Sequence, residues 1–275
     1  VLRKSKSHYF YILKTHKMNL KYLYYIIISF IFSSSLSAQI PQQQIDSLIN
    51  SLPSITDKQE KVNTLNVIAW NISYNDFQQG IDYALQSVKE AKAINYNKGL
   101  SKAYNTLGTI YADLGMYNEA LKYYNITIEI NKEHDLKDGM ASAYANIANI
   151  HAHLQNFKTA KEYFLLSNKE FKAINRIDSK VKTDLSLSKV YKSLNQEDSA
   201  EYYLDEAFKS VKKKEDNIHL LANVFVYKAQ SELAKNNYAE TLLYLQDAEE
   251  KFTKVSEVVI SSNSDTKIEG TKFII

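Results

Sequence analysis

The stretch YNTLGTIYADLGMYNEALKYY, residues 104–124, decides the fold because it recurs along the chain. A related stretch begins at Tyr144 (YANIANIHAHLQNFKTAKEYF), and another begins at Asp184 (DLSLSKVYKSLNQEDSAEYYL). The three copies follow one another at equal intervals and align without a gap. A fixed period of this length is typical of a protein built from repeated units, each of which packs on its neighbours.

Small and large residues alternate at helical spacing within each copy. Small residues stand at Gly108, Ala148 and Ser188, alanines at Ala120, Ala160 and Ala200, and large apolar residues at Tyr124, Phe164 and Leu204. This alternation allows two antiparallel helices to approach closely and interlock. The short polar segment between the two halves of each copy suits the turn of a helical hairpin. Each copy therefore predicts one pair of antiparallel helices.

Two weaker copies flank these three and bring the expected number of units to five. Gly80 lies one full period before Ala120, and Thr241 lies one residue beyond a full period after Ala200. The five units are expected near residues 57–95, 98–135, 138–175, 178–214 and 216–254. Lys228 departs from the pattern, because it replaces the Leu or Ile found at the corresponding position of the central copies.

Signals for helix ends support this division. Asp57, with Glu60 three residues later, has capping-box spacing and predicts the start of the first repeat helix. Gly99 and Gly139 are expected just before the first helices of units two and three. Residues 39–56 contain a short apolar stripe ended by Pro53, which predicts a capping helix and a linker. After Phe252 the helical period fades, so residues 255–275 are expected to be a truncated or non-native tail.

Composition favours an all-α protein. The 275 residues include only six Gly and two Pro, too few for a sheet with many tight turns. The absence of Cys excludes disulfides, thiolate metal sites and a cysteine nucleophile. Residues 1–38 hold six basic and no acidic residues, so the remainder has 28 basic against 31 acidic residues. This mildly acidic body lacks the positive surface that nucleic-acid binding requires.

Residues 18–38 have the features of an export signal. Lys17 and Lys21 flank Met18, an apolar stretch covers residues 22–32, and small residues precede a cleavage site near Ala38. The expected location is therefore the periplasm or the cell envelope, without a lipid-anchor cysteine. An uncleaved segment that anchors the chain is the alternative. Residues 1–17 are interpreted as a non-native extension upstream of a start at Met18.

The repeat resembles the tetratricopeptide repeat. The resemblance rests on the small residue at Gly108, the alanine at Ala120, the aromatic residue at Tyr124 and the apolar residue at Leu107, in a form of about 40 residues where 34 is usual. It covers about residues 57–254 and is similar to the sensor regions of bacterial signalling proteins. The resemblance implies an all-α, right-handed superhelix (an α-solenoid) of about five antiparallel helical hairpins. It also implies a concave groove, lined by the first helix of each unit, that binds a peptide or protein segment.

Polar side chains of the first helices are expected to face this groove. The expected groove residues are Asn66, Trp70, Asn71, Asn105, Thr109, Asp113, Asn146, Asn149, His153, Lys189 and Lys192. An Asn amide both donates and accepts hydrogen bonds, so a row of Asn side chains suits an extended peptide backbone. The lysines suit an acidic end of a ligand. The alternative is a solvated surface for the Asn and Lys residues, and a packed core position for Trp70.

No catalytic or metal-binding pattern is found in the sequence. His151 and His153 form the local histidine pair, but two residues along a helix rotate the side chain by about 200°, so they cannot chelate one metal ion. A Gly-rich phosphate loop and a nucleophile elbow are also missing. The chain is therefore expected to be neither an enzyme nor dependent on a cofactor.

The sequence thus predicts an exported scaffold that binds a peptide or protein segment and no nucleic acid. The alternative is the sensor part of a truncated membrane histidine kinase or DNA-binding transcriptional regulator. Contact with a membrane is expected only through an uncleaved signal segment or a missing C-terminal region.

Overall fold

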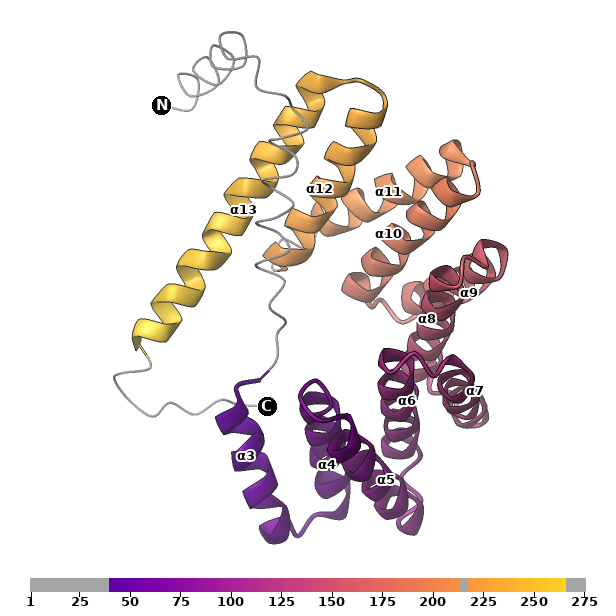
Figure 1. The fold of residues 1–275 in the computed structure, drawn as a ribbon, viewed down its shortest axis with the longest axis vertical. Helices are drawn as coiled ribbons and strands as arrows, with labels where there is room; N and C mark the ends of the chain where they lie inside the picture. The colour runs from indigo at the N-terminus through magenta and orange to yellow at the C-terminus, as the bar shows by residue number, and fades with distance from the viewer. Residues whose placement is uncertain (1–39, 213–216, 266–275) are drawn as a thin grey trace. The chain divides into compact units, whose positions relative to one another are not determined.

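The computed structural model describes residues 40–212 and 217–265, with side chains as far as residue 251. Every element in these ranges is a helix, which confirms the expected all-α class (Figure 1). The sequence predictions for residues 1–38 and for residues 266–275 lie outside the described residues.

Five helical pairs, here called units one to five, follow one another along the chain (Figure 1). They are α4 (Lys58–Ile72) with α5 (Phe77–Ala93), α6 (Asn97–Asp113) with α7 (Tyr117–Glu133), α8 (Lys137–His153) with α9 (Phe157–Ala173), α10 (Ile177–Ser193) with α11 (Glu197–Lys212), and α12 (Ile218–Ala234) with α13 (Tyr238–Asp265). The helices of a pair pack on each other, and each second helix packs on the first helix of the next unit. The chain is therefore the expected α-solenoid of helical hairpins.

The side of the chain on which the first helices of successive units lie is here called the inner face. Contacts join α4 to α6, α6 to α8, and α10 to α12. A short helix, α3 (Gln42–Ser51), and a 3-10 turn, η1 (Leu52–Ser54), precede unit one; α3 packs on α4 and buries Ile45. Asp57 caps α4 as predicted, because its side chain accepts a hydrogen bond from the backbone N–H of Glu60 at 2.7 Å.

Seven of the turns share a single construction that fixes where the preceding helix ends, whereas the turn between α4 and α5 lacks it. Residues with positive φ are Asn95, Asp135 and Asn175 between units, and Gly115, Gln155, Asn195 and Asn236 within units. In each turn the next residue donates its backbone N–H to the carbonyl five residues earlier, as Leu136 does to Asn131 at 2.8 Å. This is the Schellman arrangement that closes a helix. As a result α6, α7, α8, α9 and α10 each contain 17 residues.

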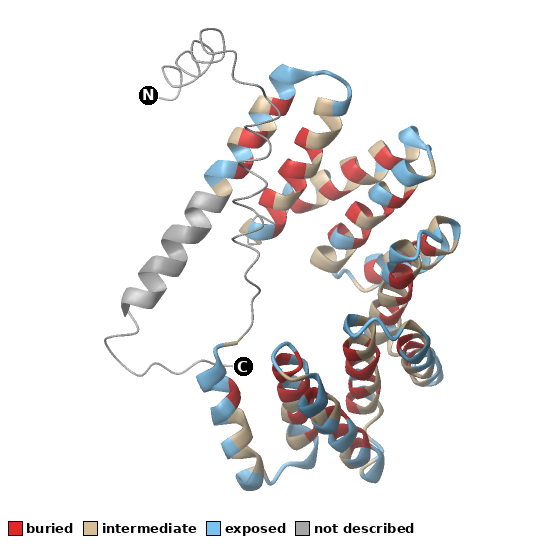
Figure 2. Ribbon diagram, in the orientation of Figure 1, coloured by how far each residue is buried: buried red, intermediate tan, exposed pale blue. Residues whose placement is uncertain are grey.

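The core depends on the alternation of small and large residues. A Cβ at Gly108 would lie 2.6 Å from the ring of Tyr124, so the interlocking predicted from the sequence is present. Aromatic rings stack at corresponding positions, with Tyr111 on Tyr123 (centroids 5.4 Å apart), His151 on Tyr163 (6.0 Å) and Tyr191 on Tyr203 (5.4 Å). Buried residues lie where helices face each other (Figure 2). His151 is therefore a packing residue.

Two sequence predictions about helix ends were wrong. Gly99 and Gly139 lie inside the first turns of α6 and α8, where they were expected just before these helices. Their role is close packing, since a Cβ at Gly99 would lie 2.5 Å from Val62 and one at Gly139 would lie 2.6 Å from Asn131. At the other end, α13 continues to Asp265, past the point near Phe252 where the helical period fades.

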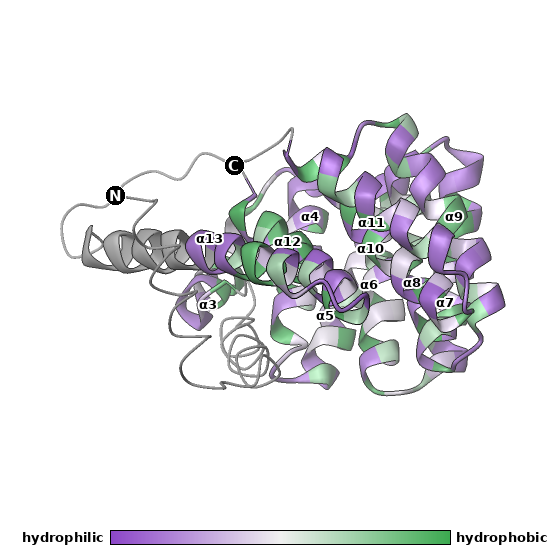
Figure 3. Ribbon diagram, turned by 90° about the horizontal axis from the view of Figure 1, so that it is seen from above, coloured by the Kyte–Doolittle hydropathy of each residue, from purple (hydrophilic) through white to green (hydrophobic). Residues whose placement is uncertain are grey.

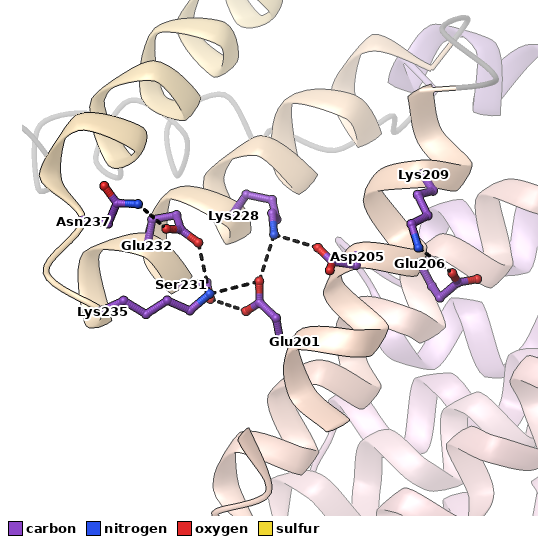
Figure 4. Close-up of polar contacts among 9 residues, drawn as sticks. All are labelled: Glu201, Asp205, Glu206, Lys209, Lys228, Ser231, Glu232, Lys235 and Asn237. Atoms are coloured by element: carbon purple, nitrogen blue, oxygen red, sulfur yellow. Dashed lines mark hydrogen bonds and ion pairs between the residues drawn. The ribbon is translucent and has the colours of Figure 1, made fainter. Parts of the chain in front are cut away.

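Lys228 fits the repeat because acidic residues of the preceding unit neutralise it. Its ammonium group lies 2.9 Å from Glu201 and 2.8 Å from Asp205 on α11 (Figure 4). Burial alone would lower the pKa of Lys228, but the hydrogen bonds and charges of Asp205 and Glu201 outweigh it and raise this pKa. The rest of α12 is largely hydrophobic (Figure 3). The departure of Lys228 from the sequence pattern is thus explained by ion pairs between this buried lysine of unit five and two partly exposed carboxylates of unit four.

Candidate functional site

A cavity of about 660 Å³ opens on the inner face of units one to three. It is lined by Asn63, Asn66, Val67, Trp70 and Asn71 of α4, by Lys98, Ser101, Lys102, Asn105 and Thr106 of α6, by Asn131 of α7, by Asp135 and Leu136 of the turn, by Lys137, Asp138, Gly139 and Ser142 of α8, and by Ile174 after α9. The lining residues of α4 and α6 recur every three or four positions, so each helix contributes one face. The volume lies within the usual range for ligand sites, roughly 300–1,000 Å³.

One wall of the cavity is apolar and partly exposed. Val67 is 44% exposed and Trp70 is 39% exposed, although both are large hydrophobic residues. The ring of Trp70 meets that of Tyr74 edge to face, with centroids 5.7 Å apart. Trp70 is therefore not the packed core residue that the sequence left as an alternative. An exposed aromatic residue beside polar groups is typical of a binding surface.

Three polar residues form what we call the cavity floor: Asn66, Ser101 and Asn131. The Nδ2 of Asn66 donates to the carbonyl of Gly99 at 3.1 Å, and the hydroxyl of Ser101 donates to the Oδ1 of Asn131 at 2.7 Å. Asn66 is 6% and Asn131 is 1% exposed. The second polar atom of each amide, Oδ1 of Asn66 and Nδ2 of Asn131, has no hydrogen-bond partner in the described part of the chain. Both atoms are themselves buried, so they are exceptions to the rule that buried polar atoms are paired.

Charged residues at the rim nearly balance one another. Lys98, Lys102 and Lys137 are exposed, as are Asp135 and Asp138. Asp138 also forms an exposed ion pair with Arg176, at 3.5 Å. Exposed pairs of this kind contribute little to stability. The rim therefore gives no strong preference for a charged ligand.

Four of the residues predicted for the groove line this cavity: Asn66, Trp70, Asn71 and Asn105. The predicted row of Asn amides is largely occupied by contacts within the protein. Asn71 donates to the carbonyl of Val67 at 2.8 Å, and Asn105 accepts from Asn146 at 3.1 Å. The amide atoms without a partner belong instead to the buried Asn66 and Asn131.

The remaining predicted residues, Thr109, Asp113, Asn146, Asn149, His153, Lys189 and Lys192, lie outside the cavity lining. Thr109 is used in packing, because its hydroxyl donates to the carbonyl of Asn105 and lies 3.1 Å from the hydroxyl of Tyr124. Burial raises the pKa of Tyr124 to about 12. Asn149 is exposed on α8.

The charged and aromatic residues predicted for the groove either contact a neighbouring aromatic ring or are exposed to solvent. The ring of His153 lies 5.5 Å from that of Tyr117, and the ammonium group of Lys189 lies 4.7 Å from the centre of the Tyr227 ring. Asp113 and Lys192 lie at the surface, where partial desolvation raises the pKa of Asp113. These residues do not form one site with the cavity.

Within residues 40–212 and 217–265, no group of three or more His, Asp or Glu side chains is placed to hold a metal ion. In the same part of the chain, no helix combines the length and the apolar character needed to cross a membrane.

A family model described as tetratricopeptide repeat matches residues 99–167, from the first turn of α6 into α9. These residues include most of the cavity floor, and the helical pairs on both sides repeat the same construction. Residues 99–167 therefore form a tetratricopeptide-repeat region. No curated protein matches its sequence.

Solved structures show the same tetratricopeptide fold. BtubC (BKLC) from P. vanneervenii is 15% identical, with a TM-score of 0.66, over 87% of this chain and 96% of that chain. The Rap protein complexed with competence and sporulation factor is 17% identical, with a TM-score of 0.58, over 78% of this chain and 70% of that chain. A signal transduction ATPase with numerous domains and a tetratricopeptide repeat sensor, from Pyrococcus horikoshii, is 15% identical, with a TM-score of 0.58, over 87% of this chain and 37% of that chain. The tetratricopeptide fold is generally a non-catalytic scaffold for protein interaction.

Sequence reasoning missed Ser101 and Asn131, which lie in buried repeat positions away from the expected groove face. The sequence does contain a signal for these two residues. Both are polar, whereas the corresponding positions of units one, three and four hold apolar residues. The lysines of the rim, Lys98 and Lys102, were missed because the expected inward positions of α6 began only at Asn105.

Proposed function

We propose that the protein binds an extended segment of another protein in the cavity on the inner face of units one to three. The observation that carries this proposal is a cavity that combines an exposed wall of Trp70 and Val67 with polar side chains of α4, α6 and α8. A polypeptide segment presents both apolar side chains and amide groups, so it complements both parts. The Rap protein, a structural neighbour, is complexed with competence and sporulation factor, which supports a ligand-binding role for this fold.

The test is to select binders from a random peptide library with the full-length chain and to measure their affinity for variants. Trp70→Ala is expected to weaken binding about thirtyfold, the loss of a hot-spot residue worth about 2 kcal/mol. Leu85→Ala is the matched control, since Leu85 is 47% exposed on α5, the second helix of the same unit. Circular dichroism would verify that both variants are folded.

Peptides that bind both variants as tightly as the wild type would overturn the proposal, because the contact surface would lie away from the inner face. The proposal would also fail if the library yielded no peptide that binds the full-length chain. Binding that is lost with Trp70→Ala and kept with Leu85→Ala would support the cavity as the working surface.

We also propose that the protein is exported to the periplasm or cell envelope, on the basis of the signal features of residues 18–38. Cell fractionation followed by N-terminal sequencing tests this. An N-terminus at Gln39 in the envelope fraction is expected, and a cytoplasmic protein that retains residues 18–38 would contradict export.

A second candidate function is that of the sensor part of a signalling protein. The favouring observation is the likeness to the signal transduction ATPase, whose tetratricopeptide repeats are described as a sensor. The ligand would occupy the same cavity in this case. Sequencing the gene beyond codon 275 distinguishes the two candidates, because a sensor requires an adjoining membrane span with a histidine kinase or DNA-binding domain.

A further inference from the structure

Unit one has an apolar stripe on its inner face that the next three units lack. Val67, Trp70 and Tyr74 follow one another at helical spacing, so they share one side of α4 and of the turn after it. All three are exposed, Tyr74 by 43%. The corresponding residues of units two, three and four are polar or charged: Thr106, Thr109 and Asp113; Asn146, Asn149 and His153; Ser186, Lys189 and Ser193. The scaffold therefore does not require apolar side chains at these positions, and a ligand that covers them removes apolar surface from water.

The rings of Trp70 and Tyr74 form what we call the aromatic corner. They stand nearly perpendicular, at 88°, with centroids 5.7 Å apart. An edge-to-face pair leaves ring faces uncovered, and the face of an aromatic ring attracts cations. Elsewhere the chain places its own lysines over such faces, as Lys189 does over Tyr227 at 4.7 Å. In the described part of the chain no Lys or Arg lies over either ring of the aromatic corner, which is thus open to a cation from a ligand.

Asp113 supplies a negative charge beside the aromatic corner. The helices α4 and α6 run in the same direction and pack on each other; Tyr74 follows the end of α4, and Asp113 is the last residue of α6. Partial burial and the charge of Asp113 together raise the pKa of Tyr74, and only a nearby charge has this effect. Asp113 itself makes no hydrogen bond or ion pair within the described residues. Its partly desolvated carboxylate would therefore be stabilised by a positive charge from outside the chain.

We propose that Trp70, Tyr74 and Asp113 form a subsite for a basic side chain, Lys or Arg, of the bound segment. The cation lies over the open ring faces, Asp113 balances its charge, and the apolar stem of the side chain packs on Trp70. Since Trp70 also lines the cavity, a segment that occupies the cavity reaches this subsite along the inner face. This inference rests on the proposed function and names the class of residue that flanks the part bound in the cavity.

The test uses the fluorescence of Trp70, which is the only Trp of the chain. The full-length protein is titrated with the Nα-acetyl N-methylamides of lysine, arginine and norleucine, the last of which has the carbon chain of lysine without its charge. The lysine or the arginine derivative is expected to change the emission saturably and to bind about tenfold more tightly than the norleucine derivative. The tighter of the two identifies the basic residue that the subsite prefers.

Three variants separate the charge and the ring from other effects. Asp113→Asn and Tyr74→Leu are each expected to bind the preferred cation about tenfold more weakly. Tyr74→Phe is expected to bind as the wild type does, because it keeps the ring. The matched control is Asp247→Asn, which removes the same charge from an exposed residue of α13 and should leave binding unchanged. Circular dichroism would verify that each variant is folded.

Four results would overturn the subsite. Equal binding of the norleucine derivative would reduce the contact to an apolar one, and unchanged binding by Asp113→Asn would remove the role of the carboxylate. Binding lost as much with Tyr74→Phe as with Tyr74→Leu would point to the hydroxyl rather than the ring. The proposal also fails if neither cation changes the emission. Selected peptides that lack basic residues and still depend on Trp70 would then show that the proposed function survives without the cation subsite.

Discussion

Asn131 and Lys228 are both polar residues at buried positions that other units fill with apolar side chains, but their surroundings differ. Lys228 stands where Leu107, Ile147 and Leu187 are buried, and Glu201 and Asp205 neutralise its charge. Asn131 has one partner, Ser101, and its other polar atom is buried without a partner in the described part of the chain. A polar residue whose bonding capacity is filled is part of the scaffold. One that is buried and only half satisfied lowers the stability of the fold, because the unpaired group has lost its hydrogen bonds to water.

The largest effect on stability is expected from removing the carboxylates that neutralise Lys228. Replacing Glu201 and Asp205 together with Ala leaves the ammonium group buried without a counter-charge. The free energy of unfolding should fall by about 3 kcal/mol, measured by urea denaturation with circular dichroism.

The control for this experiment adds Lys228→Met to the same two changes. A well-packed apolar side chain should recover most of the lost stability, because the corresponding positions in the other units hold Leu or Ile. If the triple variant stays as unstable as the double variant, the acidic residues stabilise unit four in a way unrelated to Lys228.

A smaller effect is expected when the arrangement of unit two is copied into unit four. Val211→Asn places an amide where the partner position holds Val181 and offers no hydrogen bond. The expected loss is about 2 kcal/mol, again by urea denaturation. Tyr202→Asn, at a residue that is 58% exposed on the same helix, should change stability by less than about 0.5 kcal/mol. A Val211→Asn protein as stable as the wild type would mean that any unit tolerates a buried amide, and the contrast with Asn131 would disappear.

The smallest expected effect is on the loss of stability at acidic pH. Partial burial tends to raise the pKa of Glu201, but hydrogen bonds from Ser231, Lys228 and Lys235 outweigh it and lower this pKa to about 2 from its ordinary 4.5. A lowered carboxyl pKa stabilises the folded protein above pH 4.5, and this contribution is lost as the pH falls from 4.5 to about 2. Glu201→Gln should therefore lose less stability than the wild type between pH 5 and about pH 2, measured by thermal melting. Parallel curves for the two proteins would exclude Glu201 as the residue responsible.

The repeat made most of the fold predictable. The equal spacing of Ala120, Ala160 and Ala200 placed the central hairpins, and the Gly108 to Tyr124 contact follows from the same alternation. The end of α13 was not predictable in this way, because no further unit follows to repeat the pattern. Gly99 and Gly139 were assigned to helix starts because glycine is common there, whereas close side-chain contacts are their actual role.

The site was less predictable than the fold. Helical spacing gave the direction of Asn66, Trp70 and Asn105 on the inner face, and these residues do line the cavity. It could not show that Asn105 bonds to Asn146, since that contact depends on the distance between neighbouring units. Asn131 belongs to a second helix, and its amide packs against Gly139 of the next unit. Such a position is recognised by comparing units with one another rather than by the pattern within a unit.

The uniform turns and the 17-residue helices of the central units have a consequence for how such a chain changes over generations. A duplicated stretch of one full repeat would join its neighbours through the same contacts that are present now, because each unit touches only those beside it. The gene could thus gain or lose a hairpin while the pocket of units one to three remained intact. Recombination would alter the length of the scaffold, and point substitutions where two units meet would alter the ligand that it binds.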